Sequence, residues 1–439
     1  MKLAVVLVPA IVWSTAARAD DTPAIRAMLA DPGQLAAWLR ERDPIVESSK
    51  ARIEAAQEQG EQARVFPNPQ LLGGVGGIAV GDPNKFMGTQ GPTSFGQTAN
   101  YSIGIGELFE IGKRGPRQNA ADLRAREAGE AAVGVLGARL GDATATLGRL
   151  AYVAAKRDVV AANLDAARKL QDLEKVRLDN KDLSQLEYGR IELDTEEIEI
   201  QLGRAEAELA SALAACNATL YAPCSPAGLD AAAIDAGAPL PANLPEPDRA
   251  IADRPLRQAT KLEAEALGWD ATLAGRRVIP DPTVSVQYMY SHYAYSGDLP
   301  QQLALTIGIP LPMFDRGNHD AAAARATARA IEAETQAAIH EQRGTVDALL
   351  AQREKLTETL TTLEKEEIPK STLIIEQTRK AFDLGQARLA DLLLVERSHR
   401  DLLVEVLDTR FDLFNVRAQL RQALGLDDAV ARGAGRSSR

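Results

Sequence analysis

Two kinds of hydrophobic periodicity alternate along this chain, and each kind occurs in both halves. Around residues 98–108, 283–293 and 302–310, apolar residues alternate one by one with polar or small residues, which is the pattern of a β-strand. A fourth strand is expected at about 70–80, where the chain is rich in glycine. Most of the remaining sequence has helical composition, so the pattern predicts a mainly α protein with a small β part.

The strands of the second half alternate most clearly. Their apolar positions share one face, while Ser285, Gln287 and Thr306 lie on the other. Strands of about 9–11 residues cross a bilayer when tilted, so the apolar face is predicted to contact lipid, with Tyr293 and Tyr295 at the membrane interface. A half-buried hairpin of a soluble protein is the alternative. The predicted lipid-facing residues are Val284, Val286, Tyr288, Tyr290, Leu303, Leu305, Ile307 and Ile309.

Each pair of strands is followed by a long helical stretch with a seven-residue apolar repeat. This period is typical of left-handed coiled coils. The stretches run to about Leu178 and, from Asn318, to about Asp383. Sixty-odd residues would make a helix roughly 95 Å long. The repeat positions are Leu136, Leu140, Ala143, Leu147, Leu150 and Ala154 in the first helix and Leu349, Leu356, Leu360 and Leu363 in the second.

Both long helices are expected to end at a turn, at about 179–183 and 384–388, and a return helix is expected after each turn. Asn180 and Gly385 tolerate the left-handed backbone conformation that commonly ends a helix. Another helix is expected before the first strand, from about Gln34 to Val65.

The two halves repeat each other in sequence as well as in element order. The segment 64–71 (RVFPNPQL) returns at 277–284 (RVIPDPTV), and Arg114-Gly115 returns as Arg316-Gly317. The period is far longer than the roughly 20–50 residues of a solenoid repeat, so the chain is a duplicated half-protein. The predicted divisions are a first repeat over 20–221, a connector over 222–247, a second repeat over 248–426 and a disordered tail over 427–439.

The N-terminus has the pattern of an export signal. Lys2 precedes the apolar stretch Leu3 to Trp13, and Ala17-Arg18-Ala19 forms a cleavage site, so residues 1–19 are predicted to be removed. The formal net charge of −11 argues against nucleic acid as a partner. No later segment has 18 consecutive apolar residues, so a membrane position would depend on β-strands, which points to a Gram-negative outer membrane.

The only two cysteines are Cys216 and Cys224. An exported protein meets an oxidising compartment, so a disulfide is plausible. Two free thiols or part of a metal site are the alternatives. The four histidines are scattered and form no metal-spaced or nucleophile–base pair, so no enzyme, no catalytic residue, no metal site and no cofactor are predicted.

Four strands are too few to close a barrel. An open sheet in lipid would leave unpaired backbone groups, and the smallest bacterial barrels have about eight strands. The chain is therefore expected to pool its strands with copies of itself. Two copies would supply eight strands and three would supply twelve, which begin to leave an open bore.

Three further segments carry a family resemblance: 309–317 (IPLPMFDRG), 381–385 (AFDLG) and 107–115 (ELFEIGKRG). The chain resembles the TolC-like outer-membrane efflux family, and the last segment resembles its cation-efflux (CzcC-like) branch. The resemblance implies a homotrimer with a 12-stranded barrel on a periplasmic α-helical tunnel. It also implies a periplasmic adaptor, a membrane fusion protein, and an inner-membrane pump of the resistance-nodulation-division type.

The resemblance also assigns roles to both helix turns. It implies that the adaptor docks at this tip and that rings of aspartate narrow it. Asp391 occupies one such position, while Leu394 occupies the second; a helix N-terminal carboxylate is the alternative role for Asp391. Lys181 replaces the usual glycine in the first turn, which is expected to be about two residues shorter. The implied docking residues are Asn180, Lys181, Asp182, Leu183, Ser184, Leu384, Gly385, Gln386, Ala387, Arg388 and Leu389.

The function implied is that of an outer-membrane channel that passively conducts substrate, with heavy-metal cations as the expected cargo. A drug-efflux or type I secretion exit duct of the same fold is an alternative. A soluble periplasmic coiled-coil adaptor is another, because heptad helices alone explain much of the sequence.

Overall fold

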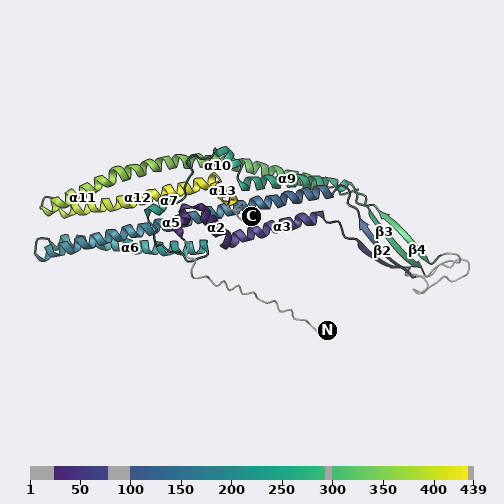
Figure 1. Ribbon diagram of the computed structural model, residues 1–439, viewed down its shortest axis with the longest axis horizontal. Helices are drawn as coiled ribbons and strands as arrows, with labels where there is room; N and C mark the ends of the chain where they lie inside the picture. The colour runs from purple at the N-terminus through teal and green to yellow at the C-terminus, as the bar shows by residue number, and fades with distance from the viewer. Residues whose placement is uncertain (1–23, 78–98, 292–298, 434–439) are drawn as a thin grey trace, which may run out of the picture. The chain divides into compact units, whose positions relative to one another are not determined.

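A computed structural model describes residues 24–77, 99–291 and 299–433 (Figure 1). The expected signal peptide and the expected interfacial residues Tyr293 and Tyr295 lie outside these residues. Among the residues described, no helix is both long enough and apolar enough to cross a membrane.

The described chain is mostly helical, with one small sheet, as the periodicity predicts. The helices of the first half are α1 (Ile25–Ala30), α2 (Pro32–Arg42), α3 (Pro44–Arg64), α5 (Arg114–Asp179), α6 (Gln185–Leu220) and α7 (Ala231–Ala236). Those of the second half are α8 (Pro247–Ala252), α9 (Pro255–Gly275), η1 (Arg276–Val278), α10 (Asn318–Thr362), η2 (Leu363–Glu367), α11 (Ile368–Asp383), α12 (Leu389–Ala423) and α13 (Leu426–Gly433). The strands are β1 (Gln70–Gly76), β2 (Asn100–Leu108), β3 (Thr283–Ser291) and β4 (Gln301–Gly308).

The four strands form one antiparallel sheet in the order β1-β2-β3-β4. The central pair, β2 and β3, joins the two sequence repeats, with Ile103 opposite Tyr288 and Ile105 opposite Val286. Strands β1 and β4 are the two edges, so within the described chain each has a neighbour on one side only.

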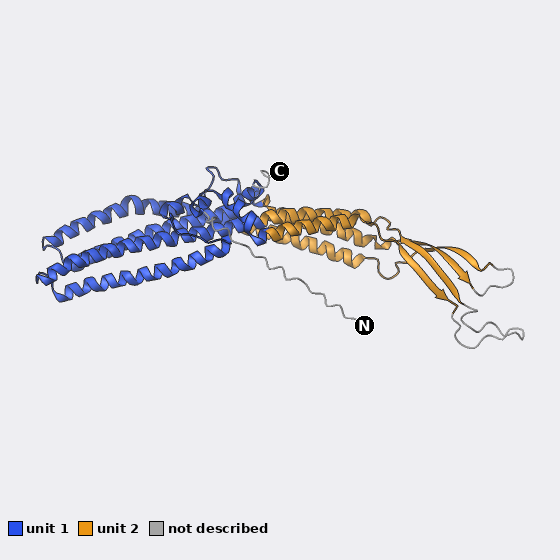
Figure 2. Cartoon of the chain, turned by 60° about the horizontal axis from the view of Figure 1, so that its bottom comes forward, with its two compact units in different colours: residues 1–46, 135–251, 342–439 blue, residues 47–134, 252–341 orange. Residues whose placement is uncertain are grey.

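Two compact units divide the chain, and each draws on both sequence repeats (Figure 2). Unit 2 contains Glu47–Gly134 and Ala252–Glu341, and therefore the whole sheet with the helical segments next to it. Unit 1 contains Val135–Ile251, Gln342–Arg439 and the residues up to Val46. The repeats are thus interleaved, because each contributes strands to the one sheet and a helix turn to the other unit.

The helix expected from Gln34 to Val65 is interrupted. It consists of α2 and α3, which are separated at Asp43 because a residue before proline is disfavoured in the helical conformation. The side chain of Asp43 accepts a hydrogen bond from the Ile45 N–H (2.8 Å) and an ion pair from Arg139 Nε (2.7 Å). A buried carboxylate thus occupies the break.

The second long helix is also not continuous. A π-helical turn, η2, separates α10 from α11 just before Pro369. Proline lacks an N–H, and its ring clashes with the carbonyl four residues earlier, here that of Lys365. A π turn accommodates that carbonyl without ending the helix.

The prediction of a disordered tail from residue 427 is wrong for its first part, because α13 occupies Leu426–Gly433. Arg421, which is 5 % exposed, pairs with Asp427 at 2.8 Å and also donates to the Pro239 carbonyl. These buried polar contacts stabilise α13. The sequence could not reveal them, because charged residues near the end of a chain are usually exposed.

The connector packs closely against α12 in unit 1. The Phe414 ring is fully buried, in contact with Gly148 of α5 and with Gly237, directly after α7. A Cβ at Gly148 would lie 2.0 Å from this ring, and one at Gly237 would lie 2.6 Å from it. The two glycines therefore form a notch that only a residue without a side chain allows.

Candidate functional site

One face of the sheet is a continuous apolar surface. Strand pairing places Leu71 opposite Ile105, and Val286 opposite both Ile105 and Leu305, so all four strands contribute to the same face. Most of these side chains are exposed; Leu303 is 77 % exposed. The other exposed members are Val75, Tyr101, Ile103, Ile105, Val286, Tyr288, Leu305, Ile307 and the adjoining Ile309, while Val284 and Tyr290 are partly exposed. An exposed apolar patch of this extent marks a membrane or a protein interface.

The opposite face of the sheet carries mostly small and polar side chains, with Leu72 and Met289 among them. Gly104 is packed so closely that an added Cβ would lie 2.4 Å from the Val286 carbonyl oxygen. Ser285 is only 6 % exposed, and Gln287 donates a hydrogen bond to it at 3.5 Å. The polarity of the two faces is therefore opposite, as the alternation predicts.

Two of the linkers that connect the sheet to the helices are bonded to each other, and we call this contact the seam. The linker after β2 meets the linker before β3: the Phe109 N–H donates to the Pro282 carbonyl at 2.9 Å. Asp281 accepts a bond from the Ile111 N–H at 3.0 Å and an ion pair from Lys113 at 2.6 Å. Because both charged side chains are largely buried, this ion pair holds the two repeats together at the base of the sheet.

The turn between α5 and α6 follows a standard helix-ending motif. Lys181 has a left-handed backbone (φ 68°), and its N–H donates to the Leu178 carbonyl at 2.9 Å. The Asp182 N–H donates to the Arg177 carbonyl at 2.9 Å. This pair of bonds is a Schellman motif, which normally places glycine where Lys181 stands.

The turn between α11 and α12 repeats the motif. Gly385 has φ +71°, its N–H donates to Phe382, and the Gln386 N–H donates to Ala381 at 2.8 Å. The intervening residues are 180–184 in one turn and 384–388 in the other. The expectation that the first turn is about two residues shorter is therefore wrong, because α6 begins two residues later than the sequence repeat suggests.

The two turns share one apolar cluster within unit 1. Leu183 and Leu389, both proposed docking residues, are buried in it, and Ala387 packs partly against it. The remaining proposed docking residues lie around this cluster, and most of them are exposed. The Arg177 guanidinium stacks over the Phe382 ring at 4.8 Å. The full cluster is Leu183, Tyr188, Ile191, Phe382, Leu389 and Leu392.

Asp391 lies in the first turn of α12 and is exposed. Its carboxylate accepts a hydrogen bond from the Arg388 N–H at 3.3 Å, so it caps the helix. Glu187 occupies the same place in α6, where it forms a reciprocal capping box with Ser184. Hydrogen bonds from the Ser184 side chain and backbone lower the pKa of Glu187. Leu394, one position that the family resemblance assigns to an acidic residue, is 65 % exposed.

Cys216 and Cys224 form a disulfide at the end of α6. The Asn217 side chain accepts a hydrogen bond from the Cys224 N–H at 2.6 Å, which closes the same loop. In the described ranges no group of three or more His, Cys, Asp or Glu side chains is arranged to hold a metal ion. His399 bonds to Ser371 at 2.8 Å, and its burial lowers the pKa of the imidazole.

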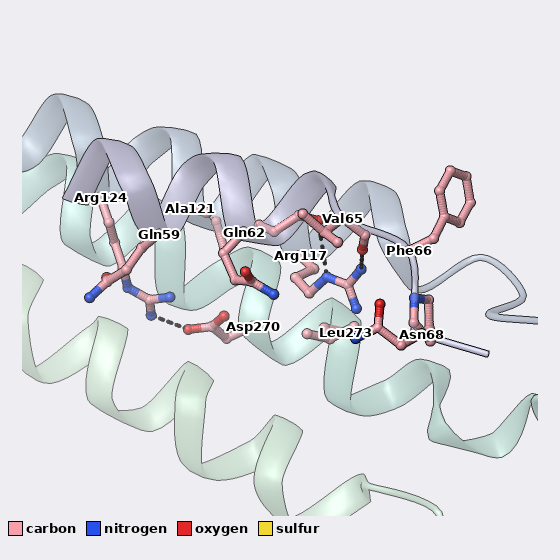
Figure 3. Close-up of a pocket in the computed structure, with 13 residues that line it drawn as sticks. Gln59, Gln62, Val65, Phe66, Asn68, Arg117, Ala121, Arg124, Asp270 and Leu273 are labelled. Carbon is pink, nitrogen blue, oxygen red and sulfur yellow. Dashed lines mark hydrogen bonds and ion pairs between the residues drawn. The ribbon is translucent and has the colours of Figure 1, made fainter. Parts of the chain in front are cut away.

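Unit 2 contains a groove of about 580 Å³ between α3, α5 and α9 (Figure 3). Arg124 pairs with Asp270 across it, and Arg117 donates to the Ala63 carbonyl at 3.1 Å. Arg117 also pairs with Glu110 at 2.5 Å. Its arginines are thus engaged in holding neighbouring segments together. The residues that line it include no serine, threonine, cysteine or histidine.

Solved structures of membrane proteins, among them outer-membrane channels, have the same fold. CusC, which forms a transmembrane channel, has a TM-score of 0.73 and 16% identity, covering 90% of this chain and 91% of CusC. VceC of Vibrio cholerae has a TM-score of 0.70 and 18% identity, covering 90% of this chain and 96% of VceC. The open-state MtrE channel of Neisseria gonorrhoeae has a TM-score of 0.70 and 16% identity, covering 90% of this chain and 88% of MtrE.

The chain therefore has the same fold as these solved membrane proteins. Residues 247–426 match the sequence profile of the family described as outer membrane efflux protein, which corresponds closely to the second of the two repeats. No curated protein sequence is similar enough to this chain to count as a match.

Sequence reasoning missed two features of the site. The first is Glu187, the structural counterpart of Asp391 in the first repeat. The sequence repeat aligns Gln185 with Asp391, whereas the starts of α6 and α12 align Glu187 with it. The S-x-x-E capping signal at Ser184 could have located the start of α6. The linker seam had no such signal, because an ion pair between Lys113 and Asp281 joins residues far apart in the chain.

Proposed function

We propose that the chain is the outer-membrane channel subunit of a tripartite efflux system in a Gram-negative bacterium. Three copies pool their sheets into one twelve-stranded barrel, and their helices continue into the periplasm as a tunnel. The profile match over 247–426 and the shared channel fold support this function. It requires no chemistry from the chain, which acts as a passive conduit and not as an enzyme.

One observation carries the proposal. The sheet has an exposed apolar face and two edge strands, β1 and β4, which have no second neighbour within the described chain. Lipid tolerates the apolar face but not the open edges, because backbone groups without hydrogen bonds cost several kcal/mol each in hydrocarbon. Pairing β4 of one copy with β1 of the next removes both edges and encloses the polar face around water.

A periplasmic adaptor and an inner-membrane pump of the resistance-nodulation-division type are the proposed partners. The adaptor would seat on the tip formed by the two turns, 180–184 and 384–388, where a shared apolar cluster supports exposed residues such as Leu384 (72 % exposed). Leu186, 71 % exposed in the first turn of α6, extends this apolar surface. Exposed leucines beside polar turn residues suit a protein partner rather than solvent.

Heavy-metal cations are the proposed cargo, supported by the resemblance of residues 107–115 to the cation-efflux branch and by the acidic character of the chain. Organic compounds or secreted proteins are the alternative cargo. Deletion of the gene, followed by growth in graded divalent metals and in graded organic toxicants, tests this assignment. A loss of tolerance confined to metals would support metal efflux, and a loss confined to organic compounds would contradict it.

The channel function itself is tested by extraction. The mature protein is expected to stay in membranes after washing with salt and alkali, to require detergent, and to be trimeric once solubilised. A monodisperse monomer in plain buffer would contradict the channel and would favour the soluble periplasmic adaptor.

A further inference from the structure

The seam at the base of the sheet occurs once inside the chain, and the sequence repeat supplies the parts for a second one. The internal seam joins the linker after β2 to the linker before β3, with the Lys113–Asp281 ion pair at its centre. The repeat places Asp315 at the position of Lys113 and Asn68 at the position of Asp281. These two residues belong to the linker after β4 and the linker before β1.

Within one chain these two linkers cannot meet, because β2 and β3 lie between β1 and β4. The start of β1 and the end of β4 both lie at the end of the sheet where the linkers to the helices are attached. If β4 of one copy pairs with β1 of another, the linker after β4 lies beside the neighbour's linker before β1. The arrangement is then the same as that of the internal seam.

We propose that neighbouring copies of this chain are joined by a second seam in which Asp315 of one copy accepts a hydrogen bond from the Asn68 amide of the next. Leu311, the repeat counterpart of Phe109, donates its N–H to the Pro69 carbonyl, as Phe109 does to Pro282. The inference rests on the proposed oligomeric channel and names the residues that hold its subunits together.

The exposed groups on the two linkers fit this pairing. Among the residues described, neither the Asn68 amide nor the Leu311 N–H has a hydrogen-bond partner. The Asp315 side chain is 75% exposed: one of its oxygens accepts the Gly317 N–H at 2.9 Å, and the other lies 3.6 Å from Arg277, which leaves room for a further donor. The internal counterparts of these groups are all bonded, so the second seam would satisfy what one chain leaves open.

Two exposed aromatic rings lie on the same linkers. Phe314 is 98 % exposed and Phe66 is 64 % exposed. Arg114 covers one side of the Phe66 ring at 3.8 Å, and Figure 3 shows this ring directed away from the other side chains of the groove. Rings this exposed are typical of an interface, and docking of the linkers would cover both of them.

The charges also complement each other. Arg114 donates to the Arg64 carbonyl and covers Phe66, but it has no carboxylate partner in the described chain. Its Nε is buried without a hydrogen bond. A neighbour's Asp315, docked beside Phe66, would bring a carboxylate towards this guanidinium. The second copy is therefore a better occupant than an unrelated partner, because it supplies both the acceptor and the ring.

A charge transplant tests the seam. Asn68→Asp alone would place two carboxylates opposite each other between copies, so the midpoint temperature at which detergent-solubilised trimers dissociate should fall by on the order of 5 °C. Asp315→Lys alone should also lower it, because the acceptor for Asn68 is lost. The double variant recreates the internal Lys113–Asp281 pair between copies and should return the midpoint to within about 2 °C of the wild type.

Native mass spectrometry during heating provides the midpoints. Additive effects of the two substitutions would overturn the seam, because residues at opposite edges of one sheet can be coupled only across copies. A second readout is a short bismaleimide applied to membranes containing Asn68→Cys/Asp315→Cys. Dimers and trimers should be cross-linked, whereas Asn68→Cys/Phe109→Cys, which pairs Asn68 with an internal linker, should give none.

The same data separate the seam from the proposed function. A wild-type protein that is monomeric would overturn both. A trimeric wild type without coupling and without cross-links would leave the channel standing and overturn the seam.

Discussion

Lys181 holds a left-handed backbone at the end of α5, at the position where the second repeat has Gly385. A side chain in this conformation costs roughly 1–2 kcal/mol, because its Cβ approaches the carbonyl oxygen. The two turns are otherwise equal in hydrogen bonding. The first tip is therefore the more strained of the two, and the strain lies in a single residue.

Lys181→Gly should stabilise this turn by about 1 kcal/mol. Hydrogen–deuterium exchange of the peptide that spans 177–188 should slow roughly fivefold. Asn180→Gly is the control, because Asn180 does not have a positive φ and should gain nothing. Equal slowing in both variants would show that backbone strain at Lys181 is absent.

At the start of α12, the capping contact of Asp391 can be separated from the role proposed for its charge. Its carboxylate caps the helix through the Arg388 N–H, and we propose that its charge, repeated in three copies, narrows the tip and favours cations there. Glu187 places a second carboxylate at the matching position of α6. Although position 394 is a leucine, Asp391 and Glu187 thus both place carboxylates near the turns.

Asp391→Asn separates the two roles, because an amide oxygen still accepts the Arg388 N–H while the charge is lost. In planar bilayers, this variant should lower cation selectivity and weaken block by divalent cations. Asp391→Ala should add fraying of α12, which circular dichroism would detect. Unchanged conductance and unchanged block in both variants would reduce Asp391 to a helix cap.

At the scale of elements, close helix packing in unit 1 depends on glycine. The Phe414 ring of α12 enters the notch made by Gly148 and Gly237, and its neighbour Phe411 stacks on Tyr152 of α5 at 4.3 Å. The Tyr152 hydroxyl donates to Asp408 at 2.6 Å. Burial is the main cause that raises the pKa of Tyr152, and this hydrogen bond is the next. Close ring packing and the Tyr152–Asp408 hydrogen bond thus join α5 to α12.

Gly148→Ala should destabilise the protein by about 1–3 kcal/mol, since the added methyl group would overlap the Phe414 ring. Thermal unfolding followed by circular dichroism would show a lower midpoint. Gly203→Ala is the matched control in α6: its Cβ would meet nothing within 4 Å, so helix propensity should make it neutral or stabilising by up to about 1 kcal/mol. A Gly148→Ala variant as stable as Gly203→Ala would contradict the notch.

At the scale of the whole molecule, the main feature is an apolar sheet face that the described residues leave exposed. Strand register places Leu305 beside Val286 on that face, and Thr306 beside Ser285 on the other. In the proposed channel, lipid covers this face and the strands of further copies cover the two edges. Membrane insertion and oligomerisation should therefore depend on each other.

Leu305→Arg should cost about 2–4 kcal/mol if the face meets lipid, and should deplete the protein from detergent-extractable membranes. Thr306→Arg, one residue along the same strand, changes the opposite face, which the proposed barrel encloses, and this variant should remain membrane-bound. Quantitative immunoblots of washed membranes provide the measurement. Equal depletion of both variants would indicate that lipid and water do not contact different faces of the sheet, which would contradict the proposed barrel.

The sequence by itself determined the element types, the faces of the strands and the repeat. These are local properties: side chains alternate along a strand, and heptads recur along a helix, whatever lies nearby. Leu136, Leu140 and Leu147 were predicted to pack, and all three are buried. Proline effects were harder, because the break at Asp43 and the π turn before Pro369 each depend on contacts around the helix.

The tertiary structure decided which distant residues meet. It alone paired Lys113 with Asp281, enclosed Phe414 between two glycines, ordered α13 through Arg421 and aligned the two turns at equal length. Such contacts join positions separated by many residues, and their free energy appears only once the chain has brought them together. No local pattern predicts them, because the sequence around one partner does not indicate which distant residue it will meet.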